Sequence, residues 1–229
     1  MKDVVLYHGS KGGIKGSIKP ISRELCDFGQ GFYLGESKEQ AMSIVSEHSN
    51  PKLYKIKLKL SEIPQDKILI LSGKDWLYTV LSCRQRVDKF NKLSIATEWL
   101  DKIKNYDVII GPIADDRMNE AMTRFSNLAL TDEGLEACLK AVRYGNQYVL
   151  KSNFACSKAE IIGERSLVNQ DLDYIKKYGI SRRQEINSAL FNASIKYRNK
   201  GLYLDQIIDM EKGKDIQNHP NKENDGYEI

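Results

Sequence analysis

The segment Asp27–Gly35, which reads DFGQGFYLG, places three glycines among three aromatic residues. Glycine packs nothing and weakens a strand ladder, so the segment makes a poor core strand. It suits a bent segment that presents an aromatic ring to a flat ligand. A β-bulge or a hairpin explains the same mixture without any ligand. The glycine spacing misses the GxGxxG nucleotide fingerprint by one position, which excludes that motif.

A second motif, Tyr7-His8-Gly9-Ser10, lies upstream at the end of the apolar run that starts at Val4. That run predicts a buried first strand. His8 is followed by a glycine, whose missing Cβ lets a planar ligand approach the backbone closely. The motif therefore favours a binding site, and a histidine with a purely structural role is the alternative.

Hydrophobic periodicity predicts the remaining elements. Alternation and short apolar runs indicate strands at residues 54–60, 68–71, 107–110 and 147–150. Capping residues and apolar spacing indicate helices at residues 37–45, 72–81, 91–104, 118–125, 132–144, 170–177 and 182–199, with breaks at Gly179 and Gly201. The chain is thus expected to be strand-rich up to about residue 157 and helical beyond it.

Four motifs in order resemble the His–Tyr class of ADP-ribosyltransferases, which is typified by diphtheria toxin and the poly-ADP-ribose polymerases. The first two are those described above. The others are Gln40-Ala41, in a predicted helix, and residues 107–117, which read DVIIGPIADDR. More narrowly, the chain is similar to DUF3990, a family of small bacterial proteins of unassigned function placed in that superfamily. The resemblance covers roughly residues 3–157.

The resemblance implies an α+β fold, an ADP-ribosyltransferase-like split β-sandwich. Two packed, mainly antiparallel sheets would surround an NAD cleft, with helices at the flanks. Residues 1–157 would form the NAD-binding catalytic domain. Residues 158–211 would form a helical C-terminal extension, and residues 212–229 a loose tail.

The same resemblance implies roles for the two motifs. His8 would form a hydrogen bond with a ribose hydroxyl of NAD, and the Gly9 backbone would bind the nicotinamide carboxamide. Tyr33 would stack on the nicotinamide ring, so that the side chains of His8 and Tyr33 line one crevice. The residues expected to complete the NAD-binding set are Ser10, Phe28 and Gly31.

The third catalytic position is a glutamate in the diphtheria-like pattern, and strand order assigns it to Gln147 here. Glutamine can orient a hydroxyl, but it carries no charge to balance an oxocarbenium-like transition state. The change favours transfer of a single ADP-ribose and leaves open an inactive NAD-binding module. A glutamine that merely opens an exposed strand is the structural alternative. Ile44 stands where diphtheria-type toxins place a second stacking aromatic.

Asp115 and Asp116 follow a buried strand and a Gly-Pro turn. Neighbouring carboxylates shift each other's pKa, so this pair could deprotonate an acceptor or hold a substrate amine. The alternative is a solvated turn in which Asp116 caps the following helix.

Composition adds weaker constraints. The chain has 229 residues and a formal net charge of +4, a mild basic excess. A stripe of Lys55, Lys57 and Lys59 fits either a water-facing strand side or contacts to nucleic-acid phosphates. The four cysteines are widely spaced and have no metal-ligand spacing. No signal-peptide core and no membrane-length apolar run is found, so we expect a cytoplasmic protein without a membrane partner.

We therefore predict an NAD-dependent mono-ADP-ribosyltransferase that modifies a macromolecular acceptor, either a protein or a nucleic acid. Family analogy extends this to a bacterial or phage toxin or defence effector, kept with an inhibitor or antitoxin protein. Two alternatives stay open. One is a catalytically inactive NAD-binding module, and the other is a basic nucleic-acid-binding protein.

Overall fold

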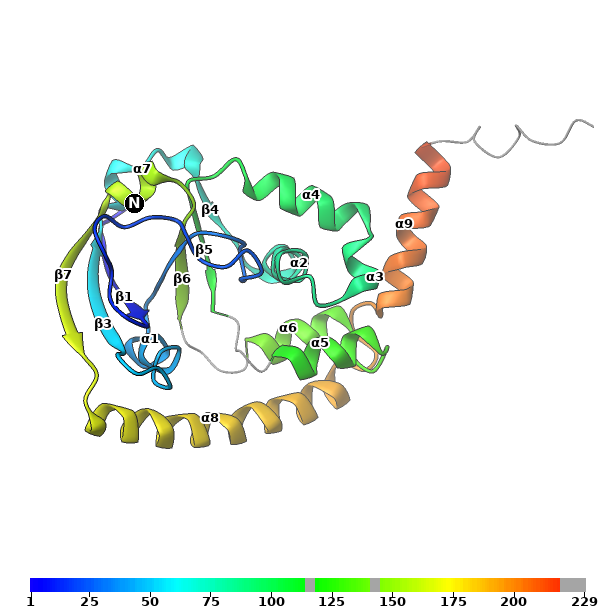
Figure 1. Cartoon of the computed structure of the whole chain (residues 1–229). Coiled ribbons are helices and arrows are strands. Elements are labelled where there is room, and N and C mark those ends of the chain that lie inside the picture. Colours follow the sequence, from blue (N-terminus) through cyan, green and yellow to red (C-terminus); the bar gives the residue numbers. More distant parts are fainter. Residues whose placement is uncertain (114–117, 141–144, 219–229) are drawn as a thin grey trace, which may run out of the picture.

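The structure is a computed structural model that describes residues 1–113, 118–140 and 145–218. Within these ranges, seven strands form one sheet in the order β4-β5-β6-β2-β1-β3-β7 (Figure 1). All described pairs are antiparallel except β4 with β5. The strands are β1 (Val4–Ser10), β2 (Phe32–Gly35), β3 (Lys52–Leu58), β4 (Ile68–Ile70), β5 (Val108–Pro112), β6 (Asn146–Leu150) and β7 (Ala159–Ser166).

Helices flank this sheet. The group α2 to α6 lies on one side of it, and the long helix α8 runs below the sheet toward α5 and α6 (Figure 1). The helices are α1 (Lys38–Ser43), α2 (Gly73–Arg84), α3 (Asp88–Asn91), α4 (Ser94–Ile103), α5 (Met118–Ser126), α6 (Asp132–Leu139), α7 (Asn153–Ser157), α8 (Asn169–Lys196) and α9 (Leu204–Asn218), with short 3-10 turns at Leu60–Glu62 and Gln65–Lys67. The arrangement is a mixed α+β fold, as predicted.

Strand alternation places the two larger clusters of the core on opposite faces of the sheet, and a third, smaller cluster lies around α1, Leu53 and Ile175. One face of β5 and β6 contributes Ile109 and Val149 to a cluster with the helices, here called the helix-side core. The other face contributes Ile110 and Leu150 to a cluster with β1 and β3, here called the strand-side core. Successive strand residues point to opposite faces, so this division fixes which side each site residue occupies.

The sheet is nearly divided between β1 and β2. β1 pairs with β3 along its whole length, from Val4 to Ser10. Its pairing with β2 is confined to Tyr7 opposite Gly35. The prediction of two packed sheets was therefore wrong in its strict form, because this one bridge joins both halves into a single sheet. Beyond the bridge, the backbones of β1 and β2 are not paired with each other.

Several elements differ from the sequence-based prediction. β2 is a true strand with Leu34 fully buried, because its glycines at 29 and 31 lie before it rather than inside it. Residues 159–166 form β7, which pairs with β3 and so extends the sheet beyond residue 157. Helix α8 continues through Gly179, which was expected to break it. A mid-helix glycine costs only about 1 kcal/mol, and Ile175 and Leu190 anchor the helix on both sides of it.

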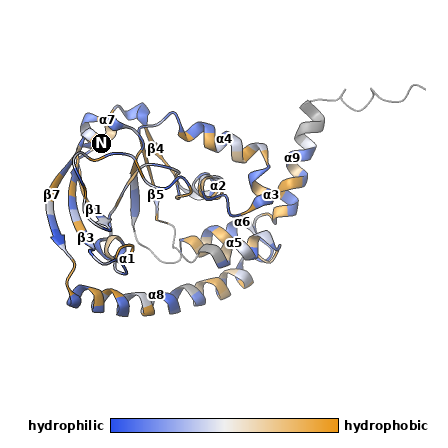
Figure 2. Cartoon of the chain, in the orientation of Figure 1, coloured by the Kyte–Doolittle hydropathy of each residue, from blue (hydrophilic) through white to orange (hydrophobic). Residues whose placement is uncertain are grey.

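The segment after the sheet is helical, as predicted, although its last helix extends further. α9 runs to Asn218, through part of the expected loose tail. Hydrophilic and hydrophobic residues alternate along α8 (Figure 2). No helix in the described part of the chain is long and apolar enough to cross a membrane.

Lys55 and Lys57 of the lysine stripe lie on β3, as the alternation predicted, and Lys59 directly follows that strand. Tyr54, Ile56 and Leu58 are buried on the other side of that strand. Lys57 lies 3.8 Å from Asp3, and Lys59 lies about as far from Glu62 and Glu160. These acids offset the positive charge of the stripe, which weakens it as a surface for nucleic-acid phosphates.

Candidate functional site

His8 lies near the end of β1 with its ring fixed on two sides. Its Nδ1 lies 2.7 Å from the carbonyl oxygen of Tyr33, and its ring stacks on Phe32 with centroids 4.3 Å apart. Because a carbonyl oxygen only accepts, Nδ1 must carry the hydrogen, which leaves Nε2 with a lone pair. Burial lowers the pKa of His8, and the bond to Tyr33 opposes this. The ring is therefore neutral near pH 7 and offers an acceptor at Nε2.

The buried state of His8 predicts how stability depends on pH. Its folded-state pKa lies below the ordinary value of 6.5, so the unfolded chain takes up a proton first as the pH falls. The unfolding free energy should therefore decrease as the pH drops below about 6.5. Thermal unfolding of the wild type and His8→Asn across this range measures the effect. An equal pH slope in both proteins would contradict it.

Tyr33 lies on β2 and is held by the loop that precedes that strand. Its hydroxyl donates to the carbonyl of Gly29 at 2.6 Å and accepts from the backbone N–H of Phe28 at 3.1 Å. Burial, followed by the charge of Asp27, raises the pKa of Tyr33 well above its ordinary range. The phenol is therefore neutral, and its orientation is fixed by the loop. The ring itself is half-buried.

The side chains of His8 and Tyr33 belong to opposite faces of the sheet. His8 stacks on Phe32, which is part of the strand-side core, whereas Tyr33 packs against the helix-side core. The structure thus brings the imidazole to the backbone of Tyr33 rather than to its ring. The two side chains therefore do not line one crevice on the same face of the sheet, as the sequence had led us to expect. Both side chains flank the line along which β1 and β2 separate.

Gly9 has a packing role that the sequence did not indicate. A Cβ on Gly9 would lie 2.0 Å from the carbonyl oxygen of Ala41 and 3.1 Å from Val45. Helix α1, capped by Ser37 Oγ on the N–H of Gln40, sits directly against this position. The glycine therefore permits the close approach of β1 and α1. Its contact with a carboxamide stays a prediction.

Gly9→Ala should destabilise the protein by ~1–3 kcal/mol, because backbone atoms rather than a flexible side chain occupy the space. Gly12→Ala is the matched control, since an added Cβ there meets nothing within 4 Å. Chemical denaturation of both variants measures the difference. Similar midpoints for the two would show that α1 shifts freely.

Gln147 is almost fully buried at the start of β6 and is fixed by both amide hydrogens. Its Nε2 donates to Asp27 Oδ2 at 2.7 Å and to the carbonyl of Pro112 at 3.1 Å. Its Oε1 accepts no hydrogen bond from the described residues. In that part of the chain, Asn91 Oδ1 is the side-chain polar atom that is both fully enclosed and without a hydrogen-bond partner. Gln147 Oε1 also lacks a partner, so it is not fully enclosed.

Sequence reasoning missed the ion pair that holds this amide. Arg84, at the end of α2, donates from Nε to Asp27 Oδ1 at 2.5 Å, and both side chains are largely buried. Asp27 lies inside the decisive motif, but nothing in the sequence joined it to Arg84 or Gln147. Such a contact forms only when α2, β6 and the loop are brought together.

Glycines flank Gln147 on both neighbouring strands. Gly35 of β2 and Gly111 of β5 both stand opposite it. The space over Gly111 is filled, because a Cβ there would lie 2.8 Å from the ring of Phe28. Among the described residues, a Cβ on Gly35 would meet only Ile113 at 3.5 Å and the Ser37 N–H nitrogen at 4.0 Å. Room is therefore left beside Gln147 on the Gly35 side.

The other predicted NAD contacts have structural partners. Phe28 is fully buried in the helix-side core, so its ring does not face a ligand. Gly31 lets the loop approach β6, since a Cβ there would lie 2.5 Å from Val149. Ser10 Oγ accepts from the backbone N–H of Gly13 at 3.1 Å. Asp115 and Asp116 lie outside the described residues. Ile44 follows α1 and is more than half exposed.

Lys151 closes the loop from the side of β6. Its Nζ donates to the carbonyl of Phe28 at 2.6 Å, and burial lowers its pKa. Nearby, burial raises the pKa of Cys83 to about 12, so that thiol stays protonated. Together with Tyr33, Lys151 fixes the conformation of the segment before β2.

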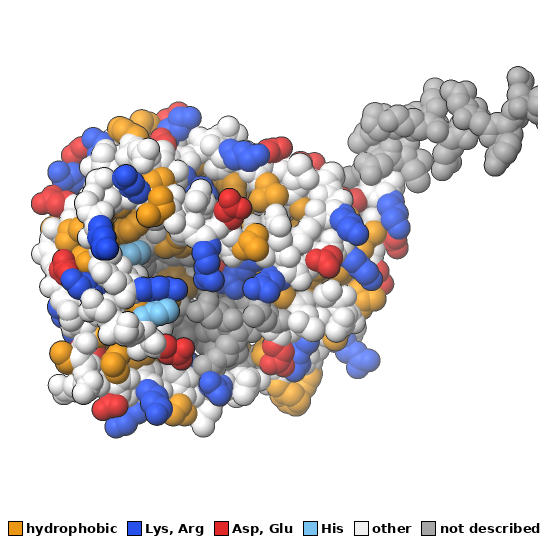
Figure 3. Space-filling model, in the orientation of Figure 1, with side chains coloured by type: hydrophobic (Ala, Val, Ile, Leu, Met, Phe, Trp, Pro, Cys, Tyr) orange, Lys and Arg blue, Asp and Glu red, His pale blue; other side chains and the backbone are white. Residues whose placement is uncertain are grey.

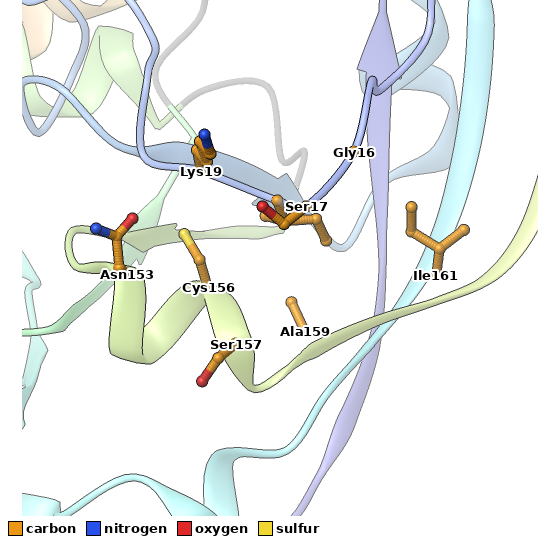
Figure 4. A pocket seen from close by; sticks show the side chains of 9 residues that line it. Gly16, Ser17, Lys19, Asn153, Cys156, Ser157, Ala159 and Ile161 are labelled. Atoms are coloured by element: carbon orange, nitrogen blue, oxygen red, sulfur yellow. The ribbon is translucent and has the colours of Figure 1, made fainter.

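The surface carries two further features. The face shown in Figure 3 is hollowed near its centre, and basic and histidine side chains lie around the hollow. A separate pocket of about 560 Å³ is lined by residues of the 16–19 loop, α7 and β7, among them Lys19, Asn153 and Cys156 (Figure 4). No residue predicted for the site lines this pocket, so it is distinct from the His8–Gln147 region.

The structure is a mixed α+β protein with a buried polar network at β6, one strand away from the division between β1 and β2. A family model described as "Protein of unknown function (DUF3990)" matches residues 4–160, and the chain belongs to that family. No curated protein and no solved structure gives a significant match.

Proposed function

We propose that this protein is an NAD-dependent ADP-ribosyltransferase that modifies a macromolecular acceptor. The observation that carries the proposal is that His8, Tyr33 and Gln147, far apart in sequence, lie on the three consecutive strands β1, β2 and β6. Their identities and order resemble the His–Tyr class of these enzymes. The proposal extends to an ADP-ribosyltransferase-like fold, with the division between β1 and β2 as the place where NAD binds.

The chemistry that this site supports is nucleophilic substitution at the nicotinamide ribose. The bond between the ribose C1′ and the nicotinamide nitrogen breaks, and its electron pair neutralises the leaving nicotinamide. The acceptor nucleophile bonds to C1′ and releases its proton to solvent. A transition state of this kind resembles an oxocarbenium ion, as in glycoside hydrolysis.

The residues of the chain would act through positioning. His8 Nε2 and Gln147 Oε1 are neutral acceptors that suit hydroxyl groups, and because they lie on opposite faces of the sheet, NAD would meet both by lying across the division between β1 and β2. Tyr33, fixed by the preceding loop, would support the nicotinamide ring. Correct orientation of the reacting atoms alone can remove several kcal/mol of an activation barrier. Gln147 adds no negative charge, which favours single transfer over chain extension.

One alternative has a specific observation in its favour. Gln147 is neutral, and its amide nitrogen is already engaged by Asp27, so the site could bind NAD without cleaving it. Release of nicotinamide from NAD by the purified protein separates the two cases, because a binding module gives none. Saturable NAD binding without nicotinamide release would establish the alternative.

The decisive experiment is transfer of label from adenylate-labelled NAD to a cell lysate, with and without nuclease or protease. The wild type should label a macromolecule, and the treatment that removes the label identifies protein or nucleic acid. A catalytic variant, His8→Asn, should label nothing. Absence of both labelling and NAD binding in the wild type would refute the proposal. A role as toxin or defence effector, with an inhibitor or antitoxin partner, belongs to the same proposal and rests on analogy.

A further inference from the structure

We propose that Asp27, anchored by Arg84, is a positioning residue that holds the Gln147 amide with its oxygen toward the space beside Gly35. In this arrangement Gln147 acts only as a hydrogen-bond acceptor, so the ligand must offer a donor there. The inference rests on the proposed function, and it explains why position 147 carries glutamine in this chain.

The hydrogen bonds around the amide fix its orientation. Asp27 Oδ1 receives Arg84 Nε, and Asp27 Oδ2 receives Gln147 Nε2. The same Nε2 also reaches the carbonyl of Pro112. A flipped amide would turn Oε1 toward two acceptors that have no hydrogen to share, and buried polar groups without partners are costly. The orientation with Nε2 toward Asp27 is therefore the one that the site permits.

The open side of the amide lies next to the predicted ligand region. Gln147 and Tyr33 point to the same face, since Gln147 stands opposite Gly35 and Val149 stands opposite Tyr33. The space over Gly35 is free of close contacts from the described residues. The oxygen of Gln147 can therefore meet a ligand that lies against Tyr33.

The network also explains why a glutamate would not fit. A carboxylate at position 147 would place an oxygen where Nε2 now lies, against both Asp27 Oδ2 and the Pro112 carbonyl, with no hydrogen to donate. Like charges at this separation in a buried site repel strongly. The negative charge stands on Asp27 instead, where Arg84 balances it. The identity of residue 147 is thus linked to the identity of residue 27.

This linkage is tested with Asp27→Asn, Gln147→Glu and the double exchange Asp27→Asn/Gln147→Glu. Each single variant should lower kcat/KM for nicotinamide release by about 10- to 100-fold, because it leaves acceptors or donors facing each other. The double exchange restores a donor at position 27 opposite an acceptor at position 147 and keeps one negative charge in the network. It should recover at least about tenfold of the loss.

The matched control is Asp132→Asn. Asp132 is a fully buried aspartate that pairs with Lys74 at 2.9 Å and lies away from the site. This variant should lower the thermal midpoint and leave kcat/KM unchanged. A similar loss of kcat/KM in Asp132→Asn would mean that activity merely follows stability, which would overturn the positioning role.

The outcomes separate this inference from the proposed function. Full activity in Asp27→Asn, or a folded double variant no better than the single ones, overturns the inference while the enzyme assignment stands. If the wild type neither binds nor cleaves NAD, the proposed function fails. The thermal midpoints of the wild type, the two single variants and the double exchange then decide the linkage. If the double exchange lowers the midpoint by the sum of the two single shifts, the linkage is overturned, and if it lowers the midpoint by less, the linkage is supported.

Discussion

Replacing His8 with asparagine should lower NAD turnover by about 100-fold or more, because a site built to bind a hydroxyl loses its acceptor. Asparagine can still donate from its amide to the Tyr33 carbonyl, and so keeps the contact that His8 Nδ1 makes. It has no group at the place of Nε2. The variant therefore separates the ligand contact from the link between β1 and β2.

Nicotinamide release and the thermal midpoint should be measured together for this variant. His48→Ala is the control, because His48 is the exposed histidine among the described residues. It should behave like the wild type in both measurements. An active, folded His8→Asn protein would show that the imidazole only ties the two strands together, and the enzyme assignment would lose its main support.

The sheet was largely predictable because its strands carry local signals. The apolar run before His8, the apolar run after Asp107 and the alternation at Tyr54 predicted β1, β5 and β3. β7 gave no such signal, since Ile161 and Ile162 are both partly exposed on an edge strand. It is defined by pairing with β3, a partner far away in the sequence. Local periodicity cannot reveal a strand of that kind.

The site was predictable only as a set of residues. Short motifs identified His8, Tyr33 and Gln147, which the sheet places on adjacent strands. The motifs could not show that His8 and Tyr33 face opposite sides, because that depends on where β2 begins. They also could not join Asp27 to Arg84, since residues so distant in sequence meet only through packing.

The glycines of the motifs show how one residue type can serve packing and binding. Gly9 and Gly31 stand where a Cβ would collide with Ala41 and Val149, so packing alone accounts for them. Gly35 differs, because a Cβ would fit there without any close contact to the described residues. Packing does not require a glycine at position 35. Space for a ligand beside Gln147 therefore accounts best for this glycine.

Filling that space should therefore abolish activity without unfolding the protein. Gly35→Val is expected to lower NAD turnover by about 100-fold or more, because the added methyl groups occupy the region beside Gln147 and Tyr33. The backbone of Gly35 is not in the left-handed region, and valine suits a strand. The thermal midpoint should thus stay close to that of the wild type.

Gly163→Val is the matched control for this substitution. Gly163 lies on β7, three strands beyond β2 in the sheet order, and an added Cβ there also meets its nearest atom at 3.5 Å. Both variants add the same side chain to a strand with the same clearance. Only Gly35→Val should lose NAD binding and turnover. Equal activity in the two variants would show that no ligand occupies the space over Gly35, and the site would have to lie elsewhere.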